Sequence, residues 1–281
     1  MKALKPRCVT LFIIVLSLFV GSVPVSSQAL AASVKLQSSP SLTISDPGRW
    51  QPVHKGMEFR QIVLERSEPK HSIDLNLVRF DSQWISPRIL RSAQFQLKSA
   101  NAKTFVEKSG AAAAINANYF DSDGKPLAFL KVGGQAINSR VSTGPLYTGL
   151  FGVKDQRPAI WHRDEFLSDQ ADQALQSGPL LLLHGIPQAV TGVPTRASRR
   201  ALIGIDHEQR LVVAVTDTVL GGLHWHELQE IFSAPTYQIQ LTDLLNLDGG
   251  GSAQLYIKAG KFEAMVPGAV EVPVAIGFFY R

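Results

Sequence analysis

The chain has 281 residues, of which 45% are hydrophobic and 18% are charged, and its formal net charge is +5. This composition is typical of a globular protein and excludes a disordered chain, a collagen, a coiled coil and a membrane protein with several spans. No segment of about 20–50 residues repeats along the sequence, which excludes solenoids and propellers. Since one core can serve up to about 250–300 residues, we expect a single domain.

The N-terminal segment, residues 1–31, has the three parts of a secretory signal peptide. Basic residues precede an apolar stretch from Cys8 to Val20, and Ala29-Leu30-Ala31 supplies a small-residue cleavage site. The stretch is shorter than the roughly 20 residues that span a bilayer. We therefore expect export to a periplasm or to the cell exterior, with no stable membrane anchor after cleavage. An uncleaved anchor is the alternative.

Cleavage after Ala31 changes which partners and which chemistry the mature chain can have. It removes three basic residues and no acidic one, which lowers the formal charge from +5 to +2. A nucleic-acid partner is therefore not expected. The sole cysteine, Cys8, leaves with the signal. The mature chain would have no disulfide, no thiolate nucleophile and no cysteine-bound metal.

Beyond the signal, residues 32–56 are rich in Ser, Pro, Gln and Gly and predict a flexible lead-in, and residues 57–281 are expected to form the domain. Apolar runs and alternation predict strands at 57–66, 73–80, 111–115, 127–132, 147–153, 158–161, 180–183, 201–205, 211–215, 244–247, 253–257 and 272–279. Caps and helical spacing predict helices at 102–108, 164–175 and 223–232. The pattern predicts an α+β fold: a single domain with mixed, mainly antiparallel sheets and a few flanking helices.

A glycine run carries the most chemical information, in the segment Asn246-Leu247-Asp248-Gly249-Gly250-Gly251-Ser252. Three successive glycines cost backbone entropy, which indicates a close approach of a ligand to the main chain or a cradle of N–H groups for an anion. Asp248 would stand beside that cradle. A tight turn between two strands, with Asp248 bonded to its own loop, is the alternative. No lysine follows the glycines, so the segment is not the phosphate loop of nucleotide hydrolases.

Three further segments place polar groups beside predicted strands. Asn116 and Asn118 point to the same side of the chain and offer amides suited to sugar hydroxyls or phosphate oxygens, with capping of the strand end as the alternative. Arg200 adjoins a buried strand, and its planar fork matches phosphate, although a solvated charge is the alternative. Ser177 precedes Gly178, whose turn either presents the hydroxyl or is purely structural.

Histidines at positions 224 and 226 have a spacing that is only superficially that of a zinc site. Residues two apart on the predicted helix face nearly opposite ways, and the nearby sequence offers no third ligand. We therefore predict no metal site and no cofactor.

Four motifs occur in order between about Ala111 and the C-terminus: Asn-x-x-Tyr-Phe, Ser-Gly-Pro-Leu, Arg-Ala-Leu-Ile-Gly-Ile-Asp and Asn-Leu-Asp-Gly-Gly-Gly-Ser. This set resembles the phosphodiester glycosidase family, which includes the enzyme that uncovers mannose 6-phosphate, with the strongest likeness to bacterial periplasmic members. The resemblance implies hydrolysis of a sugar 1-phosphodiester at the anomeric carbon–oxygen bond, giving free sugar and a phosphomonoester. It also implies a pocket lined by Asn116, Gly178, Arg200, Asp248 and glycines 249–251. Asn118 stands where the family often has glycine.

The leaving group shapes the mechanism that we expect. A phosphomonoester departs more readily than an alkoxide, so this reaction needs less acid assistance than ordinary glycoside hydrolysis. We hypothesise that Arg200 and the glycine-loop amides hold the phosphate, while Asp248 acts at the anomeric carbon as a nucleophile or by activating water. Asp217 is the best second carboxylate, and Asn116 would orient the sugar. The remaining predicted substrate contacts are Asn118, Ser177, Gly178, Asn246 and Ser252.

Two other functions fit parts of this pattern. A non-catalytic envelope module that binds glycans or phosphorylated polymers would use the same loop and Arg200 without turnover. A phosphodiesterase that breaks the phosphorus–oxygen bond is the third hypothesis. The sequence has no cluster of metal ligands, which counts against it because phosphoryl chemistry commonly recruits divalent ions. In each case the expected partner is a small or polymeric sugar phosphate.

Overall fold

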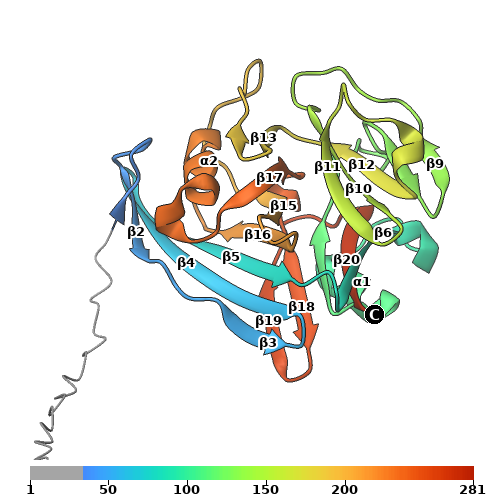
Figure 1. Ribbon diagram of the computed structural model, residues 1–281, viewed down its shortest axis with the longest axis horizontal. Coiled ribbons are helices and arrows are strands. Elements are labelled where there is room, and N and C mark those ends of the chain that lie inside the picture. The colour runs from blue at the N-terminus through green and yellow to red at the C-terminus, as the bar shows by residue number, and fades with distance from the viewer. Residues whose placement is uncertain (1–33) are drawn as a thin grey trace, which may run out of the picture. The chain divides into compact units, whose positions relative to one another are not determined.

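The computed structural model describes residues 34–281, and the predicted signal peptide lies outside the described residues. The described chain forms three sheets and two α-helices, α1 (Ala102–Ser109) and α2 (Trp225–Ser233) (Figure 1). Every strand pairing in this part of the chain is antiparallel, so the predicted mixture of strand directions is wrong. The single domain is confirmed, and it contains more β structure than we expected.

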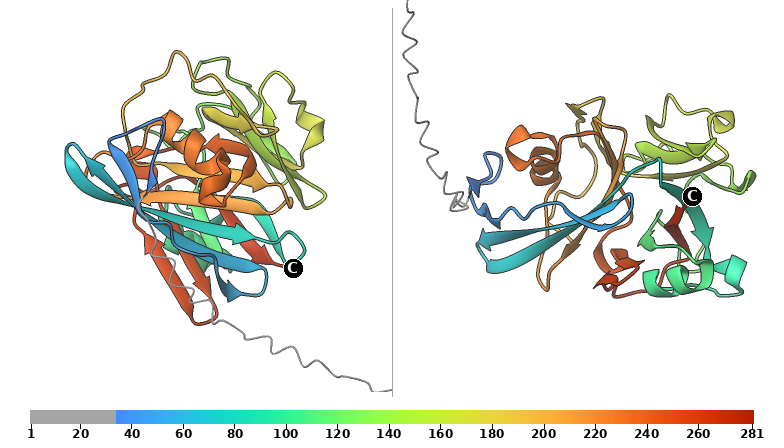
Figure 2. Two further views of the ribbon diagram at one scale, coloured as in Figure 1. Left: turned by 60° about the vertical axis from the view of Figure 1, so that its left-hand side comes forward. Right: turned by 60° about the horizontal axis from the view of Figure 1, so that its bottom comes forward.

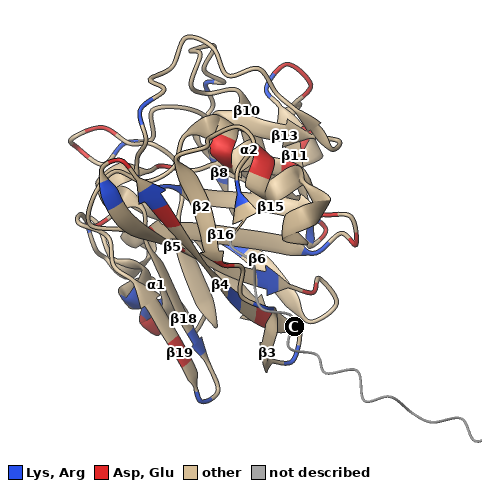
Figure 3. Ribbon diagram, turned by 90° about the vertical axis from the view of Figure 1, so that its left-hand side faces the viewer, with Lys and Arg blue, Asp and Glu red and all other residues tan. Residues whose placement is uncertain are grey.

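The largest sheet has ten strands in the order β1-β2-β4-β5-β16-β15-β17-β13-β14, with β3 paired to β4. The bounds are β1 Val34–Lys35, β2 Leu42–Asp46, β3 Gln51–His54, β4 Met57–Ser67, β5 Lys70–Phe80, β13 Leu180–Leu183, β14 Ile186–Pro187, β15 Ala201–Asp206, β16 Leu211–Asp217 and β17 Leu241–Asn246. Charged residues of β15 and β16 lie only at the strand ends, and the middle of both strands is uncharged (Figure 3).

Two five-stranded sheets complete the fold, in the orders β11-β10-β12-β8-β9 and β19-β18-β7-β20-β6. Their bounds are β6 Ile85–Arg91, β7 Ala113–Asn116, β8 Leu130–Val132, β9 Gln135–Asn138, β10 Gly149–Lys154, β11 Arg157–His162, β12 Gln173–Ser177, β18 Leu255–Ala259, β19 Phe262–Val266 and β20 Val274–Tyr280. Short 3-10 helices include η1 Ser92–Phe95, η2 Ser168–Gln170 and η4 Gly250–Ser252.

The two faces of the large sheet contact different neighbours because side chains alternate along a strand. Ile203 and Val213 belong to a core that also contains residues of the two smaller sheets. Leu202 and Val212 point the other way, into a second core that includes Leu228 of α2. Helix α2 accordingly covers one face of the large sheet (Figure 2). In residues 34–281 no helix has both the length and the apolar character required to cross a membrane.

Both helices form where cap residues permit them. In α1, which confirms the helix predicted at 102–108, the Asn101 side chain accepts the Thr104 N–H at 2.9 Å, and Gly110 ends the helix in the left-handed conformation. Helix α2 begins two residues later than predicted. His224 is its N-cap, and the His224 N–H donates to Glu227 Oε2 at 2.8 Å.

The flexible lead-in predicted for residues 32–56 is wrong for the described part of that segment. Strands β1, β2 and β3 join the large sheet, and Leu36 and Leu42 are fully buried. In β2 the apolar residues Leu42 and Ile44 alternate with polar ones. One side of the strand is therefore buried, although most of its residues are polar.

The helix predicted at residues 164–175 is also wrong. Its first part contains the single turn η2, and β12 begins at Gln173. Strand β12 lies between β10 and β8 and pairs with both. These backbone hydrogen bonds come from distant residues, so tertiary pairing overrides the local helical spacing.

Candidate active site

Arg200 and Asp248 adjoin strands β15 and β17 at the same end of the large sheet. In this antiparallel ladder Leu202 lies opposite Asn246, and the Leu247 N–H donates to the Ala201 carbonyl at 2.8 Å. Arg200 directly precedes β15, and Asp248 follows β17 by two residues. Because the strands are antiparallel, these two positions lie at one end of the sheet.

The backbone of Asp248 is fixed on both sides. Its N–H donates to the Ala117 carbonyl at 2.9 Å, and its carbonyl accepts from Asn116 Nδ2 at 2.7 Å. Burial raises the pKa of Asp248 to about 6, although hydrogen bonds from the Ser252 hydroxyl and the Gly249 N–H act in the opposite direction. The carboxylate is therefore largely ionised at neutral pH and is a stronger base than an ordinary aspartate.

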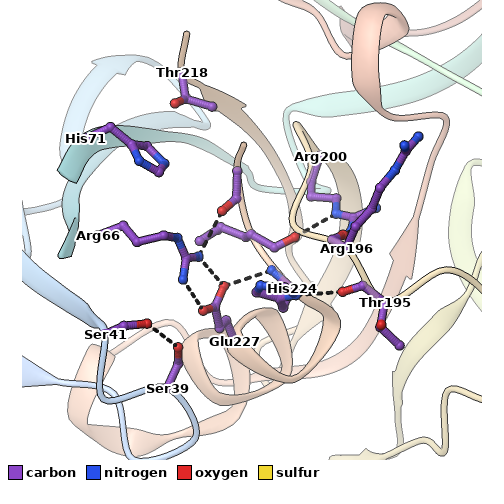
Figure 4. Close-up of polar contacts among 12 residues, drawn as sticks. Ser39, Ser41, Arg66, His71, Thr195, Arg196, Arg200, Thr218, His224 and Glu227 are labelled. Carbon is purple, nitrogen blue, oxygen red and sulfur yellow. Dashed lines mark hydrogen bonds and ion pairs between the residues drawn. The ribbon is translucent and has the colours of Figure 1, made fainter. Parts of the chain in front are cut away.

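Arg200 is a buried cation without a carboxylate partner among the described residues. Its Nε donates to the Leu223 carbonyl and its Nη2 to the Arg196 carbonyl, each at 2.9 Å (Figure 4), and the guanidinium carbon lies 3.4 Å from the centre of the Trp225 ring. Arg200 Nη1 donates no hydrogen bond to any group of residues 34–281. Burial lowers the pKa of Arg200 to about 10, which still leaves the side chain charged at neutral pH.

Tyr119 links the segments around these two charges, and the sequence analysis missed it. Its hydroxyl donates to the Gly178 carbonyl at 2.8 Å and accepts from Asn246 Nδ2 at 3.0 Å. Burial raises the pKa of Tyr119 above its usual range, and the charges of both Asp248 and Arg200 also act on it. The phenol thus lies within electrostatic reach of both. Tyr119 belongs to the Asn-x-x-Tyr-Phe motif, so its position was visible in the sequence although its role was not.

Three buried polar atoms around Tyr119 have no hydrogen-bond partner in the described chain, namely Asn118 Oδ1, Ser177 Oγ and Asn246 Oδ1. Asn118 Nδ2 donates to the Tyr119 carbonyl at 3.0 Å, and Ser177 directly precedes the glycine that accepts from Tyr119. Leaving a buried polar atom unpaired is costly, so such atoms indicate a bound water or ligand. All three residues were predicted to contact substrate.

The glycine loop is not the open anion cradle that we expected. The Gly250 N–H donates to the Arg199 carbonyl at 2.9 Å, the Ser252 N–H donates to the Gly249 carbonyl at 3.1 Å, and the Gly249 N–H bonds to the carboxylate of Asp248. The amides of Gly249 and Gly250 are therefore occupied by acceptors of the protein itself, whereas a phosphate contact of the Gly251 amide stays a prediction. A Cβ on Gly249 would lie 2.8 Å from the Arg199 oxygen, so this glycine permits close packing against the chain before β15.

Two other predicted substrate contacts support the loop instead. Asn116 is fully buried, and its Nδ2 donates to the Asp248 carbonyl while its Oδ1 accepts the Gln254 N–H at 3.0 Å. The carbonyl of Gly251 accepts the Ala269 N–H at 2.7 Å. Asn116 therefore holds the main chain of Asp248, rather than presenting a free amide to a sugar.

The second carboxylate predicted at Asp217 is wrong. Arg200 and Thr216 exchange hydrogen bonds, with the Arg200 N–H donating to Thr216 Oγ1 at 2.7 Å. Because neighbours in a strand point to opposite faces, Asp217 faces away from the side of the sheet that carries Arg200. It lies opposite Asp74 of β5, whose pKa is raised by burial and by the charge of Asp217.

The two histidines near α2 stack with their ring centres 5.4 Å apart, instead of facing opposite ways. His224 is the N-cap and lies outside the helical turn, so helical spacing does not apply to it. Its Nδ1 is 2.6 Å from the Thr195 carbonyl. Within residues 34–281 no group of three potential metal-ligating side chains comes together.

Comparisons with known proteins bear on the family and the fold. A family model described as phosphodiester glycosidase matches residues 109–279. No curated protein matches the chain in sequence.

Several solved structures are similar to this chain, among them one from zebrafish and one from Synechocystis. The catalytic domain of zebrafish N-acetylglucosamine-1-phosphodiester α-N-acetylglucosaminidase, auto-inhibited by its propeptide, has a TM-score of 0.61 and 15% identity, with coverage of 85% of this chain and 88% of that chain. A hypothetical protein from Synechocystis has a TM-score of 0.59 and 16% identity, with coverage of 84% of this chain and 64% of that chain. At these identities the likeness shows a shared fold.

Proposed function

Because the chain belongs to the phosphodiester glycosidase family, we propose that it hydrolyses the glycosidic bond of a sugar 1-phosphodiester and releases free sugar and a phosphomonoester. One observation carries the proposal: Asp248 and the buried guanidinium of Arg200, which has no ion-pair partner among the described residues, adjoin strands at the same end of the large sheet, and both charges act on Tyr119. The name of the zebrafish relative states the same kind of linkage.

Arg200 is suited to hold the phosphate that leaves. Two backbone carbonyls and the face of Trp225 fix its guanidinium, and its Nη1 donors have no partner in the described chain. When the anomeric carbon–oxygen bond breaks, the electron pair stays on the phosphate oxygen. A cation that is already in place stabilises this charge without reorganisation, which is the usual origin of a large rate effect.

Asp248 is suited to act at the anomeric carbon. Its pKa of about 6 makes it mainly a carboxylate at neutral pH, so it either attacks the carbon or accepts a proton from the water that does. In both routes a water oxygen ends on the sugar, and the phosphate departs as a monoester. Asn116 positions the carboxylate through the backbone, and Tyr119 joins the turn at Gly178 to the end of β17.

The test is turnover of a sugar 1-phosphodiester that carries a chromogenic alcohol on its phosphate, coupled to a phosphomonoesterase. Asp248→Asn should lower turnover at least about 100-fold, the scale that loss of a general base or nucleophile typically produces. Asp217→Asn is the matched control, because this carboxylate faces away from the site, and it should keep the parent rate. A normally folded Asp248→Asn protein with the parent rate would remove Asp248 from the mechanism.

The same assay separates the two competing functions. A binding module releases no reducing sugar from the phosphodiester. A phosphodiesterase releases products, but in ¹⁸O-water it places the label in the phosphate. The proposed glycosidase places the label in the sugar, because water attacks carbon.

We also propose that the enzyme acts outside the cytoplasm, since residues 1–31 have the pattern of a signal peptide. Expression of the full chain in a bacterium, followed by fractionation and N-terminal sequencing, tests this. A periplasmic or secreted protein that begins at Ala32 is the expected result. Retention in the cytoplasm with an intact Met1 would contradict it.

A further inference from the structure

A hollow with a volume of about 820 Å³ lies on the described surface, and neither Asp248 nor Arg200 lines it. Its walls come from the end of β6, the turn at 121–127 and the segment 137–140. Apolar side chains in the wall include Leu130, Ile137 and Val274. We call this the basic hollow, after the four basic side chains that line it, namely Arg91, Lys98, Lys125 and Arg140.

The charges of the basic hollow do not cancel. Against the four basic residues stand two acidic ones, Asp121 and Asp123, which leaves a surplus of two positive charges. Asp121 Oδ1 is used by its own turn, accepting the N–H groups of Asp123 and Lys125 at 2.9 and 2.8 Å. Asp123 pairs with Lys125 at 3.6 Å. No carboxylate in residues 34–281 lies within 4.0 Å of three of the cations: Arg91, Lys98 and Arg140.

Two chain segments connect the basic hollow to the candidate active site. Asp121 lines the hollow, and Tyr119, two residues earlier, reaches the active site. Arg140 also lines the hollow, and its segment continues to Tyr147, whose ring packs edge-on against Tyr119 at 5.7 Å. A third connection runs through the backbone, because the Ala117 N–H donates to the carbonyl of Val274 in the hollow wall at 3.2 Å and the Ala117 carbonyl accepts from Asp248 at 2.9 Å.

We propose that the basic hollow binds the part of the substrate beyond the scissile phosphate, and that this part is a polyanion, a glycan or polyol chain with further phosphodiester groups. The inference rests on the proposed function and names its substrate class. Cations without carboxylate partners match phosphates, which they bind with charge-assisted hydrogen bonds. A volume of about 820 Å³ exceeds the space that one phosphate needs and suits several linked units.

The kinetic test compares two substrates with the same sugar 1-phosphate. In one the phosphate carries a small chromogenic alcohol, and in the other it carries an oligomer of glycerol phosphate. For the double variant Arg91→Gln/Arg140→Gln we expect KM for the long substrate to rise about 10-fold with kcat unchanged, and no change for the short substrate. Lys261→Gln, in the exposed turn between β18 and β19, is the control. An equal effect on both substrates, or none on the long one, overturns the proposal.

A binding test keeps this proposal separate from the proposed function. Calorimetry measures the affinity of the protein for a glycerol phosphate oligomer without a sugar and for a neutral maltooligosaccharide. Tighter binding of the anionic probe, weakened by the Arg91→Gln/Arg140→Gln change and by added salt, supports the basic hollow even if no sugar phosphodiester is hydrolysed. Failure of the anionic probe to bind, or binding that the double variant does not alter, overturns it even if the short substrate is hydrolysed.

Discussion

Arg66 and Arg200 are each 6% exposed, and their side chains meet neighbouring peptide groups of the same loop (Figure 4). Arg66 Nη2 donates to the Gly222 carbonyl at 3.0 Å, and Arg200 Nε donates to the Leu223 carbonyl at 2.9 Å. Their counter-ions differ. Arg66 binds both carboxylate oxygens of Glu227, at 3.0 and 2.8 Å, whereas no carboxylate of the described chain pairs with Arg200.

The difference separates a buried charge that has a counter-ion from one that has none in the described chain, and it is the second kind that we propose to be functional. Burial alone would raise the pKa of Glu227, but its bonds to Arg66 and to the His224 N–H outweigh burial and lower it. The two charges of that pair neutralise each other within the protein. Arg200 has carbonyls and an aromatic face, which orient the cation without neutralising it. A buried cation of this kind is suited to bind an anionic ligand, which would supply the missing counter-ion.

The comparison predicts unequal losses of stability. Arg66→Met leaves the fully buried Glu227 without a counter-ion and should cost about 3–5 kcal/mol of the free energy of unfolding. Arg200→Met strands no carboxylate and should cost about 1–2 kcal/mol, for two lost hydrogen bonds. Urea unfolding measures both. The double variant Arg66→Met/Glu227→Leu should regain most of the loss, and equal costs for the two single variants would contradict the distinction.

Enzymatic activity should respond in the opposite order, with a larger loss for the change at Arg200 than for the change at Arg66. Arg200→Met should lower kcat/KM for a sugar 1-phosphodiester by about 10²–10³-fold, the range for loss of one donor to a developing negative charge. Arg200→Lys keeps the charge, but a lysine cannot bind both carbonyls and also present a further donor. Its kcat/KM should therefore also fall well below that of the parent. Steady-state kinetics, corrected for the folded fraction, check this. Arg66→Met that impairs the folded enzyme as strongly as Arg200→Met would break the comparison.

The pH dependence of stability isolates Asp248. Burial raises its pKa from 3.8 to about 6. Between these values the unfolded chain has released the proton that the folded chain retains, so rising pH favours unfolding, and the penalty is complete above about pH 6. Asp248→Asn removes this penalty. The variant should be about 1–2 kcal/mol more stable than the parent above about pH 7, and the gain should disappear below about pH 4. Urea unfolding across this range is the measurement, and a gain independent of pH would contradict it.

The smallest expected effect concerns the aromatic face under Arg200. Trp225→Phe keeps a ring under the guanidinium but loses the hydrogen bond from Nε1 to the Pro194 carbonyl. It should lower the free energy of unfolding by about 0.5–1.5 kcal/mol. Trp225→Leu removes the ring as well and should cost about 0.5–1 kcal/mol more. Thermal unfolding compares the two. Equal stability of the two variants would mean that the ring face contributes nothing to holding the cation.

The sequence predicted the parts of the fold that local patterns encode. The strands at 57–66 and 73–80 correspond to β4 and β5, and the hairpin of 201–205 with 211–215 corresponds to β15 and β16. Strand β6 was missed because Pro87 interrupts it. A proline is tolerated there because β6 is the last strand of its sheet, where one side of the backbone needs no partner.

The candidate site was predictable only in part. Arg200 and Asp248 could be selected because each adjoins an apolar strand beside a distinctive motif. Their place at one end of the large sheet follows from the pairing of β15 with β17, which sequence spacing does not encode. The error at Asp217 has the same origin, since one residue along β16 reverses the direction of the side chain. Tyr119 acts through contacts with two distant segments, which no local pattern reveals.

The pairing of strands β5 and β6 has a practical consequence for anyone who expresses only the part of the chain that the family model matches. The family model begins at residue 109, but β5 covers one side of β16, and β6 covers one side of β20. A fragment cut at that boundary would leave two long, apolar strand edges open. Such edges recruit other chains and aggregate. The smallest useful expression unit therefore includes the N-terminal strands, although they lie outside the recognised region.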